Sequence, residues 1–258
     1  MLEPGTRRFE GGVTMLDDYR DRYPNISITR EDGLLEVRLH TDGGPLAWSA
    51  AAHRDLGILF GQIGADRENR VVLLSGTGNV FCDTIDHETF ADLRWEQIWS
   101  EGKRLLQSLV DIEVPVVGVV NGPATIHAEL VAISDIVVAA DHAVLADKAH
   151  FINGAVPSDG VHLIWPHLLG PNRGRHFLLT GRELSAQEAF DLGVVAEVVS
   201  AAGAYARGLE IARSLAIHSS RVLRYTREAV AGEWRALLHG SSLSNGLGLE
   251  GLATDLPR

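Results

Sequence analysis

Residues 121–160, NGPATIHAELVAISDIVVAADHAVLADKAHFINGAVPSDG, hold the pattern that decides the fold. The apolar run Val116–Val120 leads into the Asn-Gly-Pro turn, and a second run, Ile136–Ala140, follows a short helical piece. Short apolar runs bounded by turns are typical of parallel strands covered on both faces. A buried charge is costly unless it is paired or used. The first candidates for a site are therefore the ionisable residues of this stretch: His127, Glu129, Asp147, His150 and Asp159.

Strand and helix signals alternate on either side of this stretch. They predict strands at residues 26–30, 34–40, 71–75, 143–146 and 194–199, and helices at residues 50–63, 95–110, 159–169 and 185–192. This alternation indicates βαβ units and therefore an α/β fold. After residue 200 helices dominate, at residues 205–217 and 220–231. We expect a core at residues 23–200, a C-terminal helical region at 201–258, and a mobile or loosely draped N-terminal extension at 1–22.

Composition excludes several classes of function. The chain has 258 residues and a formal net charge of −11, with no basic stripe that could neutralise phosphates or anionic lipids. We therefore expect no nucleic-acid and no membrane partner. The single cysteine, Cys82, forbids an internal disulfide and suits a reducing compartment. Because the first residues lack the apolar run of a secretion signal, a cytoplasmic location is the expectation.

His150 and Asp159 could form a catalytic pair. A histidine whose ring N–H bonds a carboxylate is held in one tautomer and becomes a better general base. Nine positions separate the two residues through a Gly-Ala-Val-Pro turn, which is enough chain to bring them together. In the alternative reading, His150 is an ordinary core or surface histidine and Asp159 caps the following helix.

His127 lies just after a buried strand, where α/β folds place ligand-binding loops. It could donate a hydrogen bond to negative charge that develops on a substrate oxygen, or it could be a structural histidine. Glu129 could be an acid or base, or a carboxylate favoured by a helix N-terminus. A metal site from His142, Asp147 and His150 lacks any specific ligand spacing, so no metal is predicted.

Four segments follow one another in a recognisable order: GTGNVFCDTID from residue 76, VPVVGVVNGPATIHAELVAISDIVVAA from 114, GAVPSDGVHLIWPHLLG from 154 and GRHFLLTGRELSAQEAFDLGVVAEVV from 174. Together they resemble the crotonase (enoyl-CoA hydratase/isomerase) superfamily over roughly residues 25–255. The resemblance implies a spiral of ββα units and a C-terminal helical region that packs the chain as a homotrimer or a dimer of trimers.

Departures from the usual family pattern are informative. Small glycines that help to form a thioester oxyanion hole are replaced by Thr125-Ile126-His127-Ala128, and the other oxyanion loop reads Phe81-Cys82-Asp83-Thr84-Ile85-Asp86. One family carboxylate position still holds Glu129, whereas His150 occupies the other. These substitutions resemble the branch of 6-oxocamphor hydrolase and related β-diketone hydrolases.

The resemblance to this branch implies roles for particular residues. His150 and Asp159 would be the catalytic pair, His127 would be catalytic in the Asn-Gly-Pro loop, and Trp48 and Glu250 would bind substrate. It implies a hydrolase that cleaves a carbon–carbon bond of a cyclic β-diketone, a retro-Claisen reaction, without a cofactor. Two alternatives stay open: an acyl-CoA hydratase or isomerase that uses Glu129, and a trimeric scaffold without catalysis.

Overall fold

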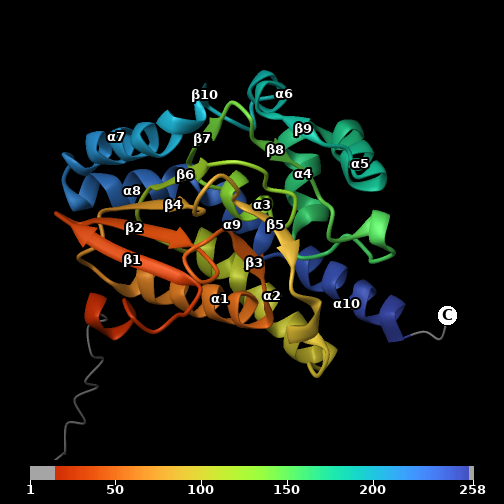
Figure 1. Cartoon of the computed structure of the whole chain (residues 1–258). Helices are drawn as coiled ribbons and strands as arrows, with labels where there is room; N and C mark the ends of the chain where they lie inside the picture. The colour runs from red at the N-terminus through yellow and green to blue at the C-terminus, as the bar shows by residue number, and fades with distance from the viewer. Residues whose placement is uncertain (1–14, 256–258) are drawn as a thin grey trace, which may run out of the picture.

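The computed structural model describes residues 15–255 and shows an α/β fold built on a twisted sheet (Figure 1). Six strands form this sheet in the order β1-β2-β4-β6-β7-β10. β1 and β2 pair antiparallel, and the other neighbours pair parallel. The strands are β1 (Ile26–Glu31), β2 (Leu34–Leu39), β4 (Val71–Ser75), β6 (Val116–Val120), β7 (Ile136–Ala140) and β10 (Glu197–Val199). The buried runs that predicted β4, β6 and β7 are strands over the predicted residues.

Short strands form a second, smaller layer beside the sheet. β3 (Leu46–Trp48) pairs with β5 (Cys82–Ile85), and β8 (Val144–Leu145) pairs with β9 (Leu184–Ser185). Ala124 connects the two pairs, because it bridges both Cys82 and Leu145. The strand predicted at residues 143–146 therefore exists as β8, within this small layer. This layer carries Trp48 and the segment that leads to His150.

Ten α-helices surround the sheets in residues 15–255: α1 (Ala50–Ala65), α2 (Trp95–Val110), α3 (Glu129–Ala132), α4 (Val161–Leu169), α5 (Pro171–Thr180), α6 (Ala186–Asp191), α7 (Ala204–Ala216), α8 (Ser220–Val230), α9 (Gly232–Leu238) and α10 (Ser241–Asp255). The Ser185 hydroxyl and the Glu188 carboxylate form a capping box at the start of α6, as the sequence indicates. The helix predicted from residue 159 begins instead at Val161, because Asp159 and Gly160 both adopt positive φ.

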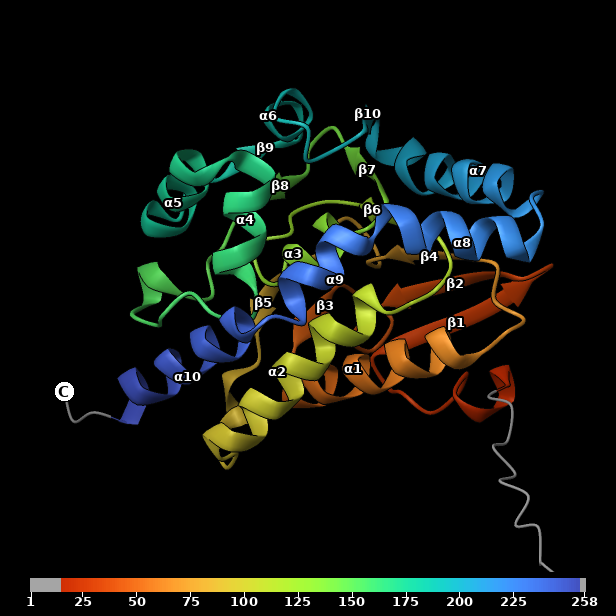
Figure 2. The same ribbon diagram turned by 180° about the vertical axis from the view of Figure 1, so that it is seen from behind.

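Helix packing places the C-terminal helices on two sides of the molecule. α7 packs on β4 and β6, and a Cβ at its Gly208 would lie 2.3 Å from Val119 Cγ2, so the close approach requires glycine. α10 packs instead against α2, α4 and α9. Figures 1 and 2 show α10 at the opposite end of the molecule from α7. None of the helices in the described part of the chain is long and apolar enough to cross a membrane.

The N-terminal stretch is packed where the structure describes it. Tyr19 is fully buried, and its hydroxyl donates a 2.9 Å hydrogen bond to the Asp66 carboxylate. Asn69 donates to the same hydroxyl at 3.0 Å, so the tyrosine is fixed from two sides. Tyr19 therefore anchors residues 15–22 of the predicted N-terminal extension, a contact that the polar pattern of the stretch did not indicate; the mobility of the extension stays a prediction. Residues 1–14, which the same prediction includes, lie outside the described residues.

Candidate active site

The candidate site lies beyond the carboxyl ends of β4 and β6, where loops of parallel sheets place functional groups. Asn121, directly after β6, ties these loops together. Its Oδ1 accepts from the Gly76 amide at 3.0 Å, and its Nδ2 donates to the carbonyls of Gly78 and Val80 at 3.0 and 2.8 Å. A Cβ at Gly122 would lie 1.7 Å from the Asn79 carbonyl oxygen, so only glycine permits this crossing.

Backbone hydrogen bonds then bring the two histidine segments together. The Ala124 amide donates to the Val144 carbonyl at 2.7 Å, the Ala146 amide to Ala124 at 3.1 Å, and the Lys148 amide to Thr125 at 2.9 Å. The chain that carries His150 thus runs beside the chain that carries His127. These hydrogen bonds follow from the bridge between β8 and Ala124, and they fix the backbone segments that carry His127 and His150.

His150 is 4 % exposed and lies between two carboxylates. Its Nδ1 is 2.7 Å from Asp147 Oδ1, a hydrogen bond, whereas its Nε2 is 4.0 Å from Asp159 Oδ2. The structure therefore brings Asp159 to the predicted histidine without a direct hydrogen bond, and Asp147 is the carboxylate that orients the ring. Burial alone would lower the pKa of His150, but Asp147, followed by Asp159 and Glu250, raises it to about 9.

Asp159 is held in an unusual conformation. Its φ is +46°, in the left-handed region that few residues other than glycine adopt. Its carboxylate approaches α2 at Gly102, where a Cβ would lie 2.5 Å from Asp159 Oδ1. That oxygen is buried and has no hydrogen-bond partner in the described residues. A native structure rarely leaves a buried carboxylate oxygen unsatisfied, so this atom is available to a ligand or water.

His127 forms the other half of the site. Its Nδ1 is 2.6 Å from Glu129 Oε1, and both side chains are buried. Burial would lower the pKa of His127, but the charge and hydrogen bond of Glu129 raise it. The Trp48 ring lies over the imidazole with the ring centroids 3.8 Å apart. His127 also has a positive φ of 51°. The Glu129 carboxylate is thus hydrogen-bonded to His127 Nδ1, so His127 Nε2 is the atom of this pair that a substrate can contact.

Glu250 reaches the site from α10. The Ser158 hydroxyl, next to Asp159 in sequence, donates a hydrogen bond to the Glu250 carboxylate. Burial raises the pKa of Glu250 to about 7, with a further contribution from the charge of Asp159. The structure therefore brings together, from segments at opposite ends of the chain, the six residues with a predicted catalytic or substrate-binding role: Trp48, His127, Glu129, His150, Asp159 and Glu250.

Three contributions could not be assigned from the sequence alone. Asp147 was among the first candidates and was weighed as a metal ligand, but not as the partner of His150, although its position three residues before His150 could have suggested a hydrogen bond. His53, on α1, lies edge-on to Trp48 with the ring centroids 5.9 Å apart and has an unpartnered Nδ1. Gly102 has no distinguishing signal in its helix. Within residues 15–255, no group of three metal-binding side chains is arranged to hold a metal ion.

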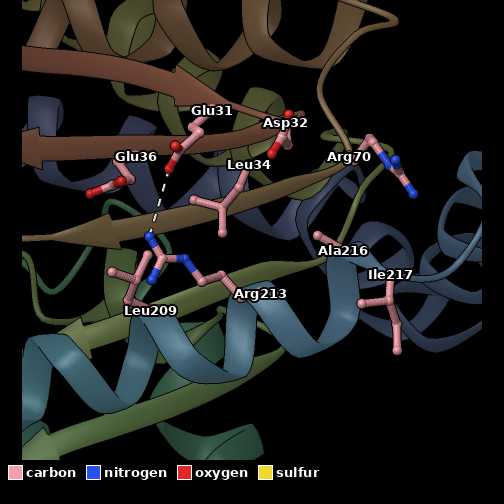
Figure 3. Close-up of a pocket in the computed structure, with 9 residues that line it drawn as sticks. All are labelled: Glu31, Asp32, Leu34, Glu36, Arg70, Leu209, Arg213, Ala216 and Ile217. Carbon is pink, nitrogen blue, oxygen red and sulfur yellow. Dashed lines mark ion pairs between the residues drawn. The ribbon is translucent and has the colours of Figure 1, made fainter.

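A separate hollow of about 270 Å³ lies at the opposite ends of the strands from the candidate site, near the starts of β2 and β4 (Figure 3). It is lined by the β1–β2 turn, Arg70 and α7, and Arg213 of α7 faces Glu31 at 3.7 Å. Three carboxylates and two guanidinium groups line it, so its charge does not favour a phosphate group. The groups described above do not extend to this hollow.

Comparison with known proteins shows the family and the fold that this chain shares. The family model described as enoyl-CoA hydratase/isomerase matches residues 29–242. A solved β-diketone hydrolase from the cyanobacterium Anabaena sp. PCC 7120, bound to (S)-3-oxocyclohexyl acetic acid, is 41 % identical with a TM-score of 0.89, over 92 % of this chain and 96 % of that one. A solved enoyl-CoA hydratase/isomerase from Mycobacterium paratuberculosis is 25 % identical with a TM-score of 0.82, over 90 % and 94 % of the chains.

Curated relatives are more distant. The putative enoyl-CoA hydratase/isomerase YngF of Bacillus subtilis is 28 % identical, over 80 % of each chain. Human chromodomain Y-like protein is 26 % identical over 69 % of this chain, which spans only 31 % of that relative. The family match covers well over half of the residues, and the fold agrees with it throughout. The chain belongs to the enoyl-CoA hydratase/isomerase family, the crotonase superfamily.

Proposed function

We propose that the protein hydrolyses a carbon–carbon bond of a cyclic β-diketone in a retro-Claisen reaction that yields a keto acid. The observation that carries this proposal is the position of His150 between Asp147 and Asp159. With Nδ1 bonded to Asp147, the Nε2 atom faces Asp159 Oδ2 at 4.0 Å. One water oxygen can lie within hydrogen-bonding distance of both atoms. A histidine base beside a carboxylate acceptor is suited to activating that water.

The reaction balances with these groups alone. His150 Nε2 takes a proton from water as the water oxygen attacks one ketone carbon. The tetrahedral alkoxide re-forms a carbonyl and breaks the bond to the carbon between the two ketones. That carbon leaves as the enolate of the second ketone, and it takes the proton back from the His150 imidazolium. The products are one carboxylic acid and one ketone, joined in a single molecule when the substrate is a ring.

His127 and Trp48 are proposed to bind the carbonyl oxygens on which charge develops. Glu129 accepts from His127 Nδ1–H and raises the pKa of His127, so the protonated ring keeps an Nε2–H that can donate to a substrate oxygen. The usual backbone donors of the family are less available in this chain, since the amides of Thr125 and Ile126 both donate to the Cys82 carbonyl. Side-chain donors would thus replace backbone donors. Glu250, with its raised pKa, is proposed to contact the substrate from the α10 side.

The substrate class follows from the leaving group. A simple ketone would have to expel an unstabilised carbanion, whereas a β-diketone expels an enolate. The solved β-diketone hydrolase that resembles this chain is bound to a molecule with one ketone and one carboxylic acid, the pair of groups that the proposed reaction forms. The 41 % identity over 92 % of the chain supports the transfer of this activity class as a proposal.

An acyl-CoA hydratase or isomerase is the second candidate, because several solved and curated relatives bear that description. It would use Glu129 as the acid or base. In the structure Glu129 already accepts a hydrogen bond from His127 and is 2 % exposed, which makes it a weaker base for a substrate. Lys103 and Lys148 are the chain's only lysines, so binding of the CoA phosphates would depend on arginine.

The test is a hydrolysis assay on monocyclic and bicyclic β-diketones, with the keto acid quantified by chromatography. We expect wild-type turnover, and a loss of about 1000-fold or more in His150→Ala. His176→Ala is the matched control, because His176 is exposed on α5 and should leave turnover unchanged. A crotonyl-CoA hydration assay with wild type and Glu129→Gln runs in parallel.

Each outcome decides between the candidates. Diketone hydrolysis that depends on His150 supports the proposal. If the wild type hydrates the enoyl-CoA but does not hydrolyse diketones, and Glu129→Gln loses the hydration, the acyl-CoA hydratase candidate is supported and the proposal is refuted. No turnover on either class, with normal folding, would refute both enzymatic candidates on these substrates and favour the scaffold. The homotrimer or dimer of trimers implied by the family remains a proposal that light scattering can test.

A further inference from the structure

We infer that Asp147 is the residue that sets the tautomer of His150, and that Asp159 acts on the water side of the ring. This inference rests on the proposed function for its catalytic meaning, but its structural content can be tested without substrate. It differs from the expectation that Asp159 orients His150. Asp147 would be a positioning residue, because it acts on the substrate only through the imidazole.

The contact distances separate the two carboxylates. Asp147 Oδ1 lies 2.7 Å from His150 Nδ1, whereas Asp159 Oδ2 lies 4.0 Å from Nε2. The first distance is that of a charge-assisted hydrogen bond, and the second is too long for any direct one. A proton on Nδ1 is thus held by Asp147. When His150 is neutral, the lone pair is then on Nε2, and it points toward the side of Asp159.

Asp147 has no competing partner in the described residues. Its side chain is 4 % exposed, and its second oxygen, Oδ2, makes no hydrogen bond. A carboxylate buried for purely structural reasons normally gains several donors, because its desolvation is costly. The desolvation cost of the Asp147 carboxylate is instead offset by its hydrogen bond to His150. Its burial is accounted for by the imidazole that it orients.

The backbone around the pair is fixed independently of both side chains. The Lys148 amide donates to the Thr125 carbonyl, and the amides of Asn153 and Ala155 both donate to the His150 carbonyl. The Asn153 side chain also donates to the Lys148 carbonyl. Replacement of Asp147 should therefore leave the segment in place, so that a change in tautomer can be read without a change in fold.

Nuclear magnetic resonance of 15N-labelled imidazoles tests the inference directly. Spectra would be recorded above pH 10, where the ring is neutral, and His150→Gln would assign its signals. We expect wild type and Asp159→Asn to show a protonated Nδ1 and an unprotonated Nε2. Asp147→Asn, in which the amide can donate to Nδ1, and Asp147→Ala should both lose this preference. The charged and titratable groups that face His150 and could shift its titration are Asp147, Asp159, Glu250, His127 and His162.

Activity gives the second readout. On a hydrolysed β-diketone, Asp147→Asn should lower kcat by about 100-fold to 10,000-fold with little change in KM, as loss of the correct tautomer does in related histidine systems. The inference is overturned if Asp147→Asn and Asp147→Ala keep the protonated Nδ1, or if Asp159→Asn is the variant that switches it. If wild type hydrolyses no diketone, the proposed function fails, while the tautomer spectra still decide the role of Asp147.

Discussion

Replacement of Gly102 by alanine should disable the site while leaving the fold intact. Gly102 lies inside α2, and a Cβ there would come within 2.5 Å of Asp159 Oδ1 and 3.3 Å of His53 Cε1. Since non-bonded atoms rest at about 3.5 Å, the Asp159 carboxylate has to move by roughly 1 Å. A misplacement of about 1 Å at a reacting group costs roughly 100-fold in rate. We therefore expect kcat on a β-diketone to fall by about 100-fold.

Stability should move little in this variant, because alanine is favoured over glycine in a helix by up to about 1 kcal/mol, which offsets part of the strain. Thermal unfolding measures this alongside the keto-acid assay. Gly61→Ala is the matched control: Gly61 lies inside α1, and the nearest atom to its Cβ would be Ser108 Oγ at 3.8 Å, an ordinary contact. Undiminished turnover in Gly102→Ala would refute the reasoning that the position of the Asp159 carboxylate limits the reaction.

Two further predictions concern titration and folding. Because the pKa of His150 is raised to about 9 and only the neutral ring can act as a base, kcat/KM should rise about tenfold per pH unit up to about pH 9. A diketone with two substituents on the carbon between its carbonyls should be used, so that the substrate itself does not titrate. A flat profile from pH 6 to 8 would contradict the role of His150 as base. Arg227→Met should lower the free energy of unfolding by about 3–5 kcal/mol, because it leaves the mostly buried Asp135 without its ion pair. Urea denaturation measures the loss, and Arg182→Met, which breaks an exposed pair with Glu188, should change stability little.

The fold could be predicted from the sequence wherever one physical signal dominated. β4, β6 and β7 are continuous apolar runs between turns, and their predicted limits agree with the structure. The helices predicted at residues 95–110 and 185–192 are present as α2 and α6, and α6 begins with a capping box. The packing of Tyr19 could not be predicted, because a single aromatic residue in a polar segment does not reveal that Asp66 and Asn69 will lie beside it.

The candidate residues were predicted as a set, but the predicted partner of His150, Asp159, is not the carboxylate that hydrogen-bonds its ring in the structure. His127 and Glu129 are two positions apart, and their hydrogen bond is local. His150 has carboxylates on both sides in the sequence, three and nine positions away, and spacing alone does not say which one reaches Nδ1. That choice depends on the ladder between residues 144–148 and Ala124, and on the left-handed turn at Asp159. The role of Gly102 can be recognised only from the packing of α2 against the turn at Asp159.

His127 and Asp159, the two residues of the candidate site with a left-handed backbone, limit how the protein can be stabilised by mutation. Each holds a backbone conformation that glycine or asparagine tolerates better, at a cost on the order of 1 kcal/mol per residue. A library selected for heat resistance alone should therefore enrich glycine or asparagine at both positions, and the enriched variants would lose the groups proposed for catalysis. Thermostabilisation of this scaffold should hold positions 127 and 159 fixed and seek its gains elsewhere.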